Sequence, residues 1–78
     1  MAHNLNPQNL SSIDHLQKLR CRSLERGYTA FVEACDAAIA WLQDHPESYI
    51  MDIPQELYPA GDSDKVLFRS SLMRYFTF

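Results

Sequence analysis

The sequence predicts an all-α fold, and three observations support this prediction. Apolar residues recur at alternating steps of three and four between Cys21 and Leu42, a spacing that places them on one face of a helix. Three of the four prolines fall within 46–59, between this stripe and a second apolar stretch at 66–76. With 78 residues, 46 % of them hydrophobic, the chain forms one small domain and is too apolar to be disordered.

The first helix is expected to follow a polar arm. Residues 1–10 are mostly polar, and we expect them to be flexible, with a single helical domain spanning 11–78. Ser11 and Ser12 offer N-cap hydroxyls, and Asp14 places a negative charge in the first turn, where the helix dipole favours it. These signals predict that the helix begins near residue 12.

Two arrangements of the first helical segment fit the pattern. In one, a single amphipathic helix runs over about 12–45 and ends at His45, because the residue before Pro46 disfavours the α conformation. In the other, Gly27 lies just beyond the end of a helix, and the segment is a helical hairpin. The stripe keeps its spacing through Gly27, which favours the single helix.

A connector and a shorter C-terminal helix complete the predicted domain. Proline and glycine interrupt residues 46–61, which we interpret as the connector. Polar and apolar side chains alternate over 48–53, so a short strand within the connector is an alternative interpretation. Asp62 and Ser63 can cap a final helix over about 63–75. Its apolar residues lie nearly all round the helix axis, so one helix of the same chain could hardly cover it.

The apolar stripe needs a partner surface. A single core in a chain of this length rarely supplies more than about 3–5 kcal/mol of stability. We therefore expect the helices to pack as a homo-oligomeric bundle, with the stripe as the oligomer interface. The stripe consists of Cys21, Leu24, Tyr28, Phe31, Cys35, Ala38 and Leu42.

Charge is segregated along the chain, whose formal net charge is −3. Residues 27–64 hold eight acids and no Lys or Arg, whereas residues 65–78 hold three basic residues and no acid. A net negative charge disfavours binding to nucleic acids or to anionic membranes. No apolar run is long enough to span a bilayer, and the first ten residues do not form a secretory signal. We expect a cytoplasmic protein without a membrane partner.

No pattern of residues indicates catalysis. His3, His15 and His45 are far apart in the sequence, and the spacing of Cys21 and Cys35 does not suit a zinc site. Cys35 falls within the apolar stripe, where burial suppresses thiol reactivity. The chain has only two glycines and therefore no glycine-rich phosphate loop. We expect no enzymatic activity, no metal and no cofactor.

The leading hypothesis is a non-enzymatic protein that binds and modulates another protein. The acidic span suits a basic or DNA-binding partner, and aromatic and arginine side chains are enriched at binding hot spots. In its most specific form, the protein is an inhibitor of a DNA-binding regulator, such as an antirepressor from a phage or mobile element. The candidate partner-binding residues are Glu33, Asp36, Trp41, Asp44, Arg74, Tyr75 and Phe76.

Two other functions remain open. The protein could be a structural subunit of a larger assembly, with its C-terminal helix buried in a partner. A weaker alternative is direct binding to nucleic acid, which predicts a steep dependence on salt. The basic residues available for it are Arg20, Arg22, Arg26, Arg69 and Arg74.

Overall fold

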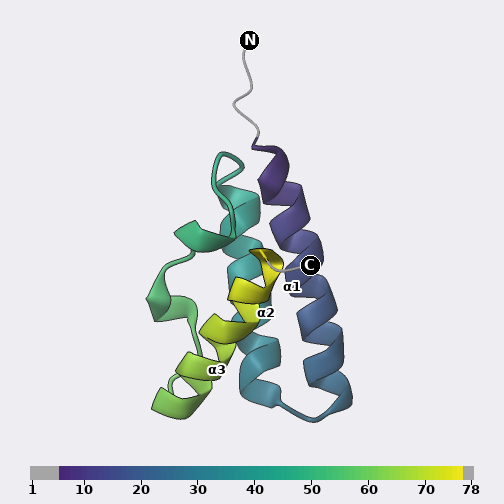
Figure 1. Ribbon diagram of the computed structural model, residues 1–78, viewed down its shortest axis with the longest axis vertical. Helices are drawn as coiled ribbons and strands as arrows, with labels where there is room; N and C mark the ends of the chain where they lie inside the picture. Colours follow the sequence, from purple (N-terminus) through teal and green to yellow (C-terminus); the bar gives the residue numbers. More distant parts are fainter. Residues whose placement is uncertain (1–5, 77–78) are drawn as a thin grey trace.

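The computed structural model describes residues 6–76, which form three α-helices joined by a tight turn and a long connector (Figure 1). The all-α prediction is confirmed, since these residues contain no strand. No helix in this part of the chain is long and apolar enough to cross a membrane. The α-helices are α1 (Pro7–Glu25), α2 (Thr29–Asp44) and α3 (Asp62–Met73), and shorter 3₁₀-helices span Ile50–Asp52, Gln55–Leu57 and Arg74–Phe76.

α1 begins at Pro7, earlier than the predicted start near residue 12. The side chain of Asn6 caps the helix, because its Oδ1 accepts a hydrogen bond from the backbone N–H of Gln8 at 2.9 Å. Pro7 occupies the first turn, where a missing N–H leaves no helical bond unmade. Residues 7–10 of the predicted arm are therefore helical, and residues 1–5 lie outside the described part of the chain.

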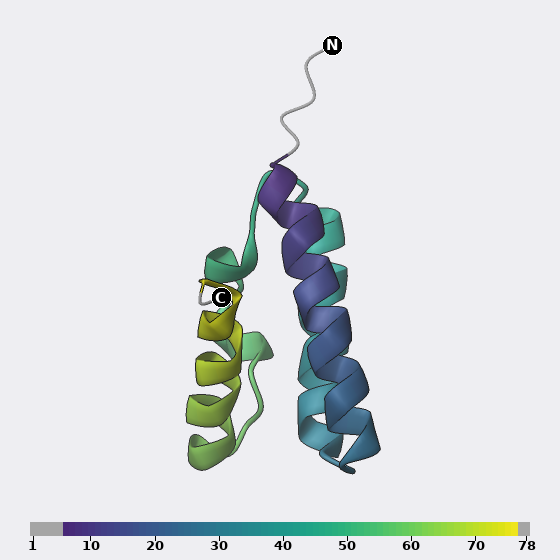
Figure 2. The same cartoon turned by 45° about the vertical axis from the view of Figure 1, so that its right-hand side comes forward.

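A turn at Gly27 separates α1 from α2, so the single helix over 12–45 is wrong and the alternative hairpin is confirmed (Figure 2). Gly27 has a φ of 75°, in the left-handed region that glycine adopts without a steric penalty. Its N–H donates to Leu24 O at 3.1 Å, and the N–H of Tyr28 donates to Ser23 O at 2.8 Å. This pair of bonds is the Schellman motif, which ends a helix even where the apolar spacing continues.

Replacing Gly27 with alanine is expected to lower the free energy of unfolding by about 1–2 kcal/mol, the cost of a left-handed L-residue. A Cβ at Gly27 would meet no atom within 4 Å, so this cost comes from the backbone and not from a clash. Gly27→Asn is the matched variant, and its free energy of unfolding should fall by less, because asparagine tolerates this conformation. Urea unfolding followed by circular dichroism measures the stability of both variants. If Gly27→Ala has the same free energy of unfolding as the natural chain, Gly27 does not adopt the left-handed conformation.

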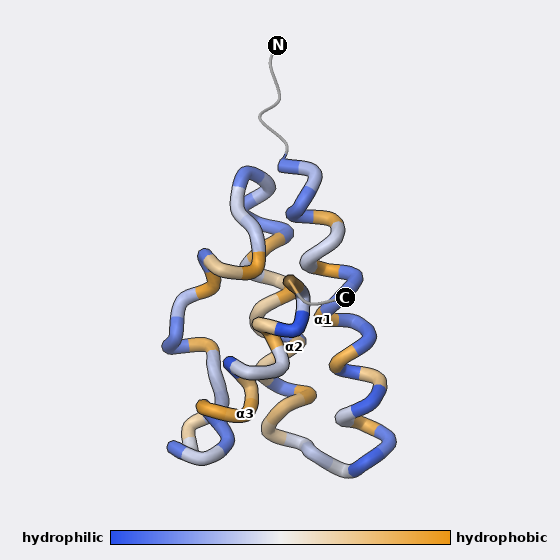
Figure 3. The backbone as a smooth tube through the Cα atoms, in the orientation of Figure 1, coloured by the Kyte–Doolittle hydropathy of each residue, from blue (hydrophilic) through white to orange (hydrophobic). Residues whose placement is uncertain are grey.

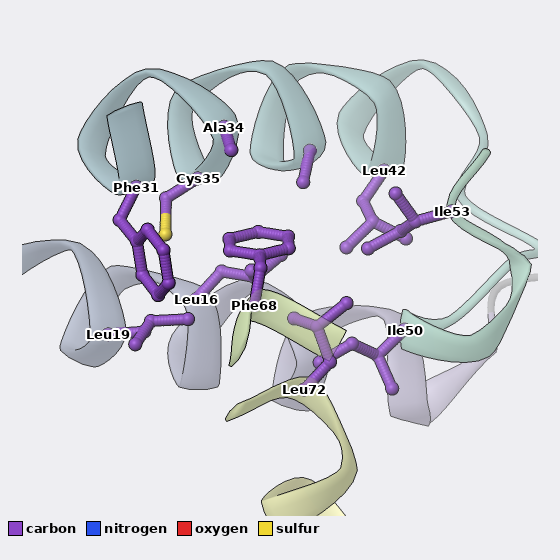
Figure 4. Packing of buried hydrophobic residues seen from close by; sticks show 11 residues of the cluster. Leu16, Leu19, Phe31, Ala34, Cys35, Leu42, Ile50, Ile53, Phe68 and Leu72 are labelled. Carbon is purple, nitrogen blue, oxygen red and sulfur yellow. The ribbon is translucent and has the colours of Figure 1, made fainter. Parts of the chain in front are cut away.

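The core lies between the α1–α2 hairpin and one side of α3. Hydrophobic and hydrophilic stretches alternate along the helices that supply it (Figure 3). Phe68 of α3 lies at the centre of the cluster, between side chains of α1 and α2 (Figure 4). Its ring contacts those of Phe31 and Tyr58 edge-on, with centroids 5.5 and 5.2 Å apart. The buried apolar residues are Leu16, Leu19, Phe31, Ala34, Cys35, Ala38, Leu42, Ile50, Ile53, Phe68 and Leu72.

The buried face of α1 differs from the one that the stripe predicts. Leu16 and Leu19 enter the core, whereas Cys21 and Leu24 are exposed. The turn at Gly27 explains the difference, because two separate helices need not turn the same side of a shared apolar stripe towards the core. The 3.6-residue period of α2 therefore cannot be extended backwards into α1.

Two buried polar residues of α1 hold the end of α2 and the connector in place. Asn9 is 5 % exposed, and Ser12 is fully buried. The Oγ of Ser12 accepts a hydrogen bond from the backbone N–H of Ile50 at 2.9 Å. The Nδ2 of Asn9 lies 2.8–3.1 Å from three carbonyl oxygens, those of Leu42, His45 and Ser48. The start of α1 is thereby bonded to the segment in which α2 ends.

Candidate protein-docking groove

α1 with the turn that follows it, and α3 with the 3₁₀-helix that follows it, line neighbouring cavities at the molecular surface. The two helices meet at His15, whose Nε2 donates to the carbonyl oxygen of Ser71 at 3.0 Å. The imidazole ring also packs edge-on against Tyr75, with ring centroids 5.7 Å apart. This contact joins the middle of α1 to the C-terminal end of α3.

Three adjoining cavities form the groove. Open cavities of about 900 and 580 Å³ occupy its two ends, and a smaller one of about 150 Å³ lies with them. Arg74 lines all three cavities. Arg22 lines the 900 and 150 Å³ cavities, and Arg26 lines the 150 and 580 Å³ cavities. The shared lining residues place the three cavities next to one another, and together they are called the α1–α3 groove.

One edge of α1 supplies the first wall. Its lining residues recur three or four positions apart, which places their side chains on one face of the helix. These residues are Ser11, His15, Lys18, Arg22 and Arg26. Opposite this edge, the 900 Å³ cavity is lined by Arg74, Tyr75 and Phe76, which follow α3. The 580 Å³ cavity lies beyond the end of α1, between the turn and start of α2 on one side and α3 on the other. Its lining includes Arg26, Tyr28, Thr29, Ala30, Phe31, Leu67, Ser70 and Ser71.

The groove carries an excess of positive charge. Four of the chain's seven Lys and Arg residues line it, against two of its ten acids. Lys18 Nζ lies 3.1 Å from Asp14 Oδ2, so that pair is internally neutralised. Within residues 6–76, Arg22, Arg26 and Arg74 form no ion pair. Three neighbouring guanidinium groups are thus without a counter-charge.

Apolar side chains lie at both ends of the groove. Tyr28 and Leu67 line one end and are 53 % and 57 % exposed. Leu10 and Phe76 line the other end and are also exposed. Arginine surrounded by exposed apolar and aromatic surface is a composition that protein interfaces favour.

The structure places part of the predicted partner-binding set in this groove. Arg74, Tyr75 and Phe76 all line the largest cavity. The signal that could have extended this set is the recurrence of polar residues at 15, 18, 22 and 26, which marks one edge of a helix. The sequence did not indicate that this edge shares cavities with Arg74, because that depends on how α3 docks.

The predicted acidic residues lie elsewhere. Glu33, Asp36 and Asp44 are exposed on α2, on the face turned away from its buried residues. Asp36 is paired with Arg20 of α1, whose Nε lies 2.6 Å from Asp36 Oδ1. Trp41 is half-buried and stacks on the ring of His45, with centroids 4.1 Å apart and 18° between the planes. The acidic set and the groove set therefore do not form one site.

The predicted oligomer seam is divided between core and surface. Phe31, Cys35, Ala38 and Leu42 are buried within the chain's own core. The first three residues of the seam are exposed, so a second copy could meet only those through the seam. They are Cys21, Leu24 and Tyr28.

The two cysteines are expected to differ sharply in reactivity. Cys21 is exposed, whereas Cys35 is fully buried, and this burial raises the pKa of its thiol to about 12. Near pH 8, the native protein should react with a disulfide reagent at one of its two thiols, and at both after unfolding, because the thiolate is the reactive form. Mass spectrometry of the labelled chain identifies the thiol. Equal labelling of both cysteines before unfolding would contradict the packing of α2.

Within residues 6–76, no three His, Cys, Asp or Glu residues are grouped so that they could hold a metal ion. Comparisons of the chain with protein-family models, with curated proteins and with solved structures find no match. The described part of the chain is thus a small three-helix domain with basic surface cavities edged by apolar side chains.

Proposed function

We propose that this protein acts by binding and modulating a larger protein, without catalysis, and that the α1–α3 groove is its docking surface. The observation that supports this proposal is the juxtaposition of exposed aromatic and apolar side chains with three arginines that form no ion pair among residues 6–76. Trp, Tyr and Arg dominate the energetics of protein interfaces. A partner that brings acids to the groove would neutralise the guanidinium groups and cover the apolar ends.

The shape and chemistry of the groove favour a macromolecular partner over a reaction. Its large cavities are open depressions, whereas small-molecule sites enclose most of the ligand. Burial raises the pKa of Cys35 and of Tyr58, and neither residue lines the groove. Catalytic sites usually gather groups with perturbed pKa values, so this arrangement supports a binding role.

A second candidate surface is the acidic face of α2. Glu33, Asp36 and Asp44 are all exposed on it, which favours a basic partner. In this form of the proposal, the protein is an antirepressor-type antagonist of a DNA-binding regulator from a phage or mobile element, and the acids meet the regulator's basic surface.

Affinity capture with charge-reversed variants separates the two surfaces. We expect Arg22→Glu/Arg74→Glu to reduce recovery of the partner by about tenfold or more, the effect of losing at least about 1.4 kcal/mol of charge pairing. The acidic-face variant Glu33→Lys/Asp44→Lys should still capture the partner. Asp36 is left unchanged in it, because Asp36 is paired with Arg20. Capture uses the full chain in extracts of its native host, followed by mass spectrometry.

Arg69→Glu is the matched control for Arg74→Glu. Arg69 is exposed on α3 but lines none of the three cavities, so its reversal changes the net charge as much as Arg74→Glu alone does, without altering the groove. The single variant Arg74→Glu is therefore tested by capture beside the double one. Circular dichroism verifies that each variant keeps its helices. Loss of the partner only in the acidic-face variant would favour the second candidate, and full retention by the groove variant would overturn docking in the groove.

A further inference from the structure

We infer that the occupant of the α1–α3 groove is an amphipathic helix of the partner protein, with acidic residues one turn apart at its middle and apolar residues towards its ends. The inference rests on the proposed function, since it specifies the chemistry of the segment that docks there. Backbone hydrogen bonding, length and charge each support it.

The walls of the groove favour a helical occupant over an extended one. The walls come from α1, the start of α2, α3 and the 3₁₀-helix Arg74–Phe76, and backbone N–H and C=O groups inside helices are bonded within the helix. Residues 6–76 contain no strand edge to which an extended peptide could add. An extended segment buried in the groove would leave its own backbone groups without partners, whereas a helix satisfies them internally.

The dimensions of the groove set the length of the occupant. The lining edge of α1 runs from Ser11 to Arg26, which is about 22 Å at about 1.5 Å per residue. α3 has 12 residues and is about 18 Å long by the same measure. A helix of about 15 residues would fill this length, and its addition would complete a four-helix arrangement with α1, α2 and α3.

The charge pattern sets the sequence of the occupant. Lys18, Arg22 and Arg26 are four residues apart, so their Cα atoms advance by about 6 Å at each step along α1. Acids at positions i, i+4 and i+8 of a docked helix are spaced by the same distance along its axis, so each could lie opposite one of these cations. Tyr28 and Leu67 at one end of the groove, and Leu10 and Phe76 at the other, would contact its apolar residues.

The same observations favour a protein over a nucleic acid. Non-specific binding to DNA depends on many phosphate contacts, and the groove offers four cations, one of them already paired with Asp14. The chain's net charge of −3 would repel a polyanion as it approached. Exposed Leu67 and Phe76 would gain nothing from a phosphate backbone but would be covered by an amphipathic helix.

The test uses synthetic probes and the full chain. The first probe is a helical peptide of about 15 residues, with glutamates at i, i+4 and i+8 of an alanine–leucine framework. The second carries lysines in place of the glutamates, the third carries a central proline that breaks the helix, and a short DNA duplex represents nucleic acid. Fluorescence anisotropy gives the affinities, and amide chemical shifts of the ¹⁵N-labelled protein locate the binding site.

We expect the glutamate peptide alone to bind, with shifts confined to the facing edges of α1 and α3. Arg22→Glu/Arg74→Glu should weaken its binding by about tenfold or more, while Arg69→Glu leaves it within about twofold. Equal binding of the lysine or proline peptide, no binding of the glutamate peptide, or tighter binding of the duplex would overturn the inference.

Competition separates failure of this inference from failure of the proposed function. A captured partner that depends on Arg22 and Arg74 but is not displaced by the glutamate peptide leaves the groove as the docking surface and overturns the acidic helix. If Arg22→Glu/Arg74→Glu captures the partner as well as the natural chain does, the proposed function itself is overturned. Displacement by the glutamate peptide, and not by the lysine peptide, supports both.

Discussion

Replacing Phe68 with alanine is expected to lower the free energy of unfolding by about 3–5 kcal/mol, the range for removing a buried phenyl ring. Phe68 is fully buried and contacts Phe31 and Tyr58, so its removal leaves a cavity between α3 and the hairpin. α3 places only Phe68 and Leu72 in the core. Because a chain of this size has about 3–5 kcal/mol to lose, most of the variant should be unfolded at room temperature.

Urea titration monitored by circular dichroism measures this loss. Val66→Ala is the matched control, because Val66 lies on the same helix and is 65 % exposed; it should change the free energy of unfolding by less than about 0.5 kcal/mol. A Phe68→Ala variant that stays within about 1 kcal/mol of the natural chain would show that α3 is not docked through this ring.

The same titration tests whether one chain completes the core. The sequence predicts an oligomeric bundle, but the structure covers Phe31, Cys35, Ala38 and Leu42 with other residues of the same chain. If folding requires no second copy, the urea midpoint is independent of protein concentration, as mass action demands. A midpoint that rises with concentration would restore the predicted bundle, through the exposed part of the seam at Cys21 and Leu24.

The helices were predictable wherever local signals act alone. The spacing of apolar residues in α2 depends only on the helical period. The stripe residues on α2 are buried, although in the chain's own core and not in the oligomer interface that the sequence predicts; they are Phe31, Cys35, Ala38 and Leu42. Pro46 marks the end of α2 through backbone sterics, and α2 ends at Asp44. α3 begins at Asp62, close to the predicted start, but Gly61 is its N-cap, so Asp62 and Ser63 lie in the first turn and do not cap the helix. Interactions between residues close in sequence therefore sufficed for these two helices.

The arrangement of the helices depends on contacts that have no local signal. A φ of 75° at Gly27 rotates α1 out of register with α2 and exposes Leu24. Two of the residues that face the core from α1, Asn9 and Ser12, are polar, so no apolar periodicity could identify them. The groove follows from the docking of α3, which brings Arg74 beside Arg22 although the two are far apart in sequence.

The second large effect is expected at Asn9, whose amide NH₂ lies within hydrogen-bonding distance of three carbonyl oxygens and shares its two N–H donors among them. Asn9→Ala should lower the free energy of unfolding by about 2 kcal/mol, because it leaves buried acceptors without a donor. Asn9→Asp should lower it further near neutral pH, although the side chains have nearly the same shape. A carboxylate can only accept, so it would place a negative charge against three carbonyl oxygens instead of donating to them.

The pH dependence distinguishes this explanation from a simple loss of packing. Three carbonyl oxygens oppose the negative charge, so the introduced carboxyl stays protonated to a higher pH in the folded state than in the unfolded chain. The Asn9→Asp variant should therefore be most stable below about pH 4, where the carboxyl can donate, and should lose stability as the pH rises. Gln8→Glu is the control, since it adds the same charge at an exposed position in the first turn of α1, where the helix dipole favours it. If the two variants have the same urea midpoint at neutral pH, Asn9 does not hold the end of α2 in place.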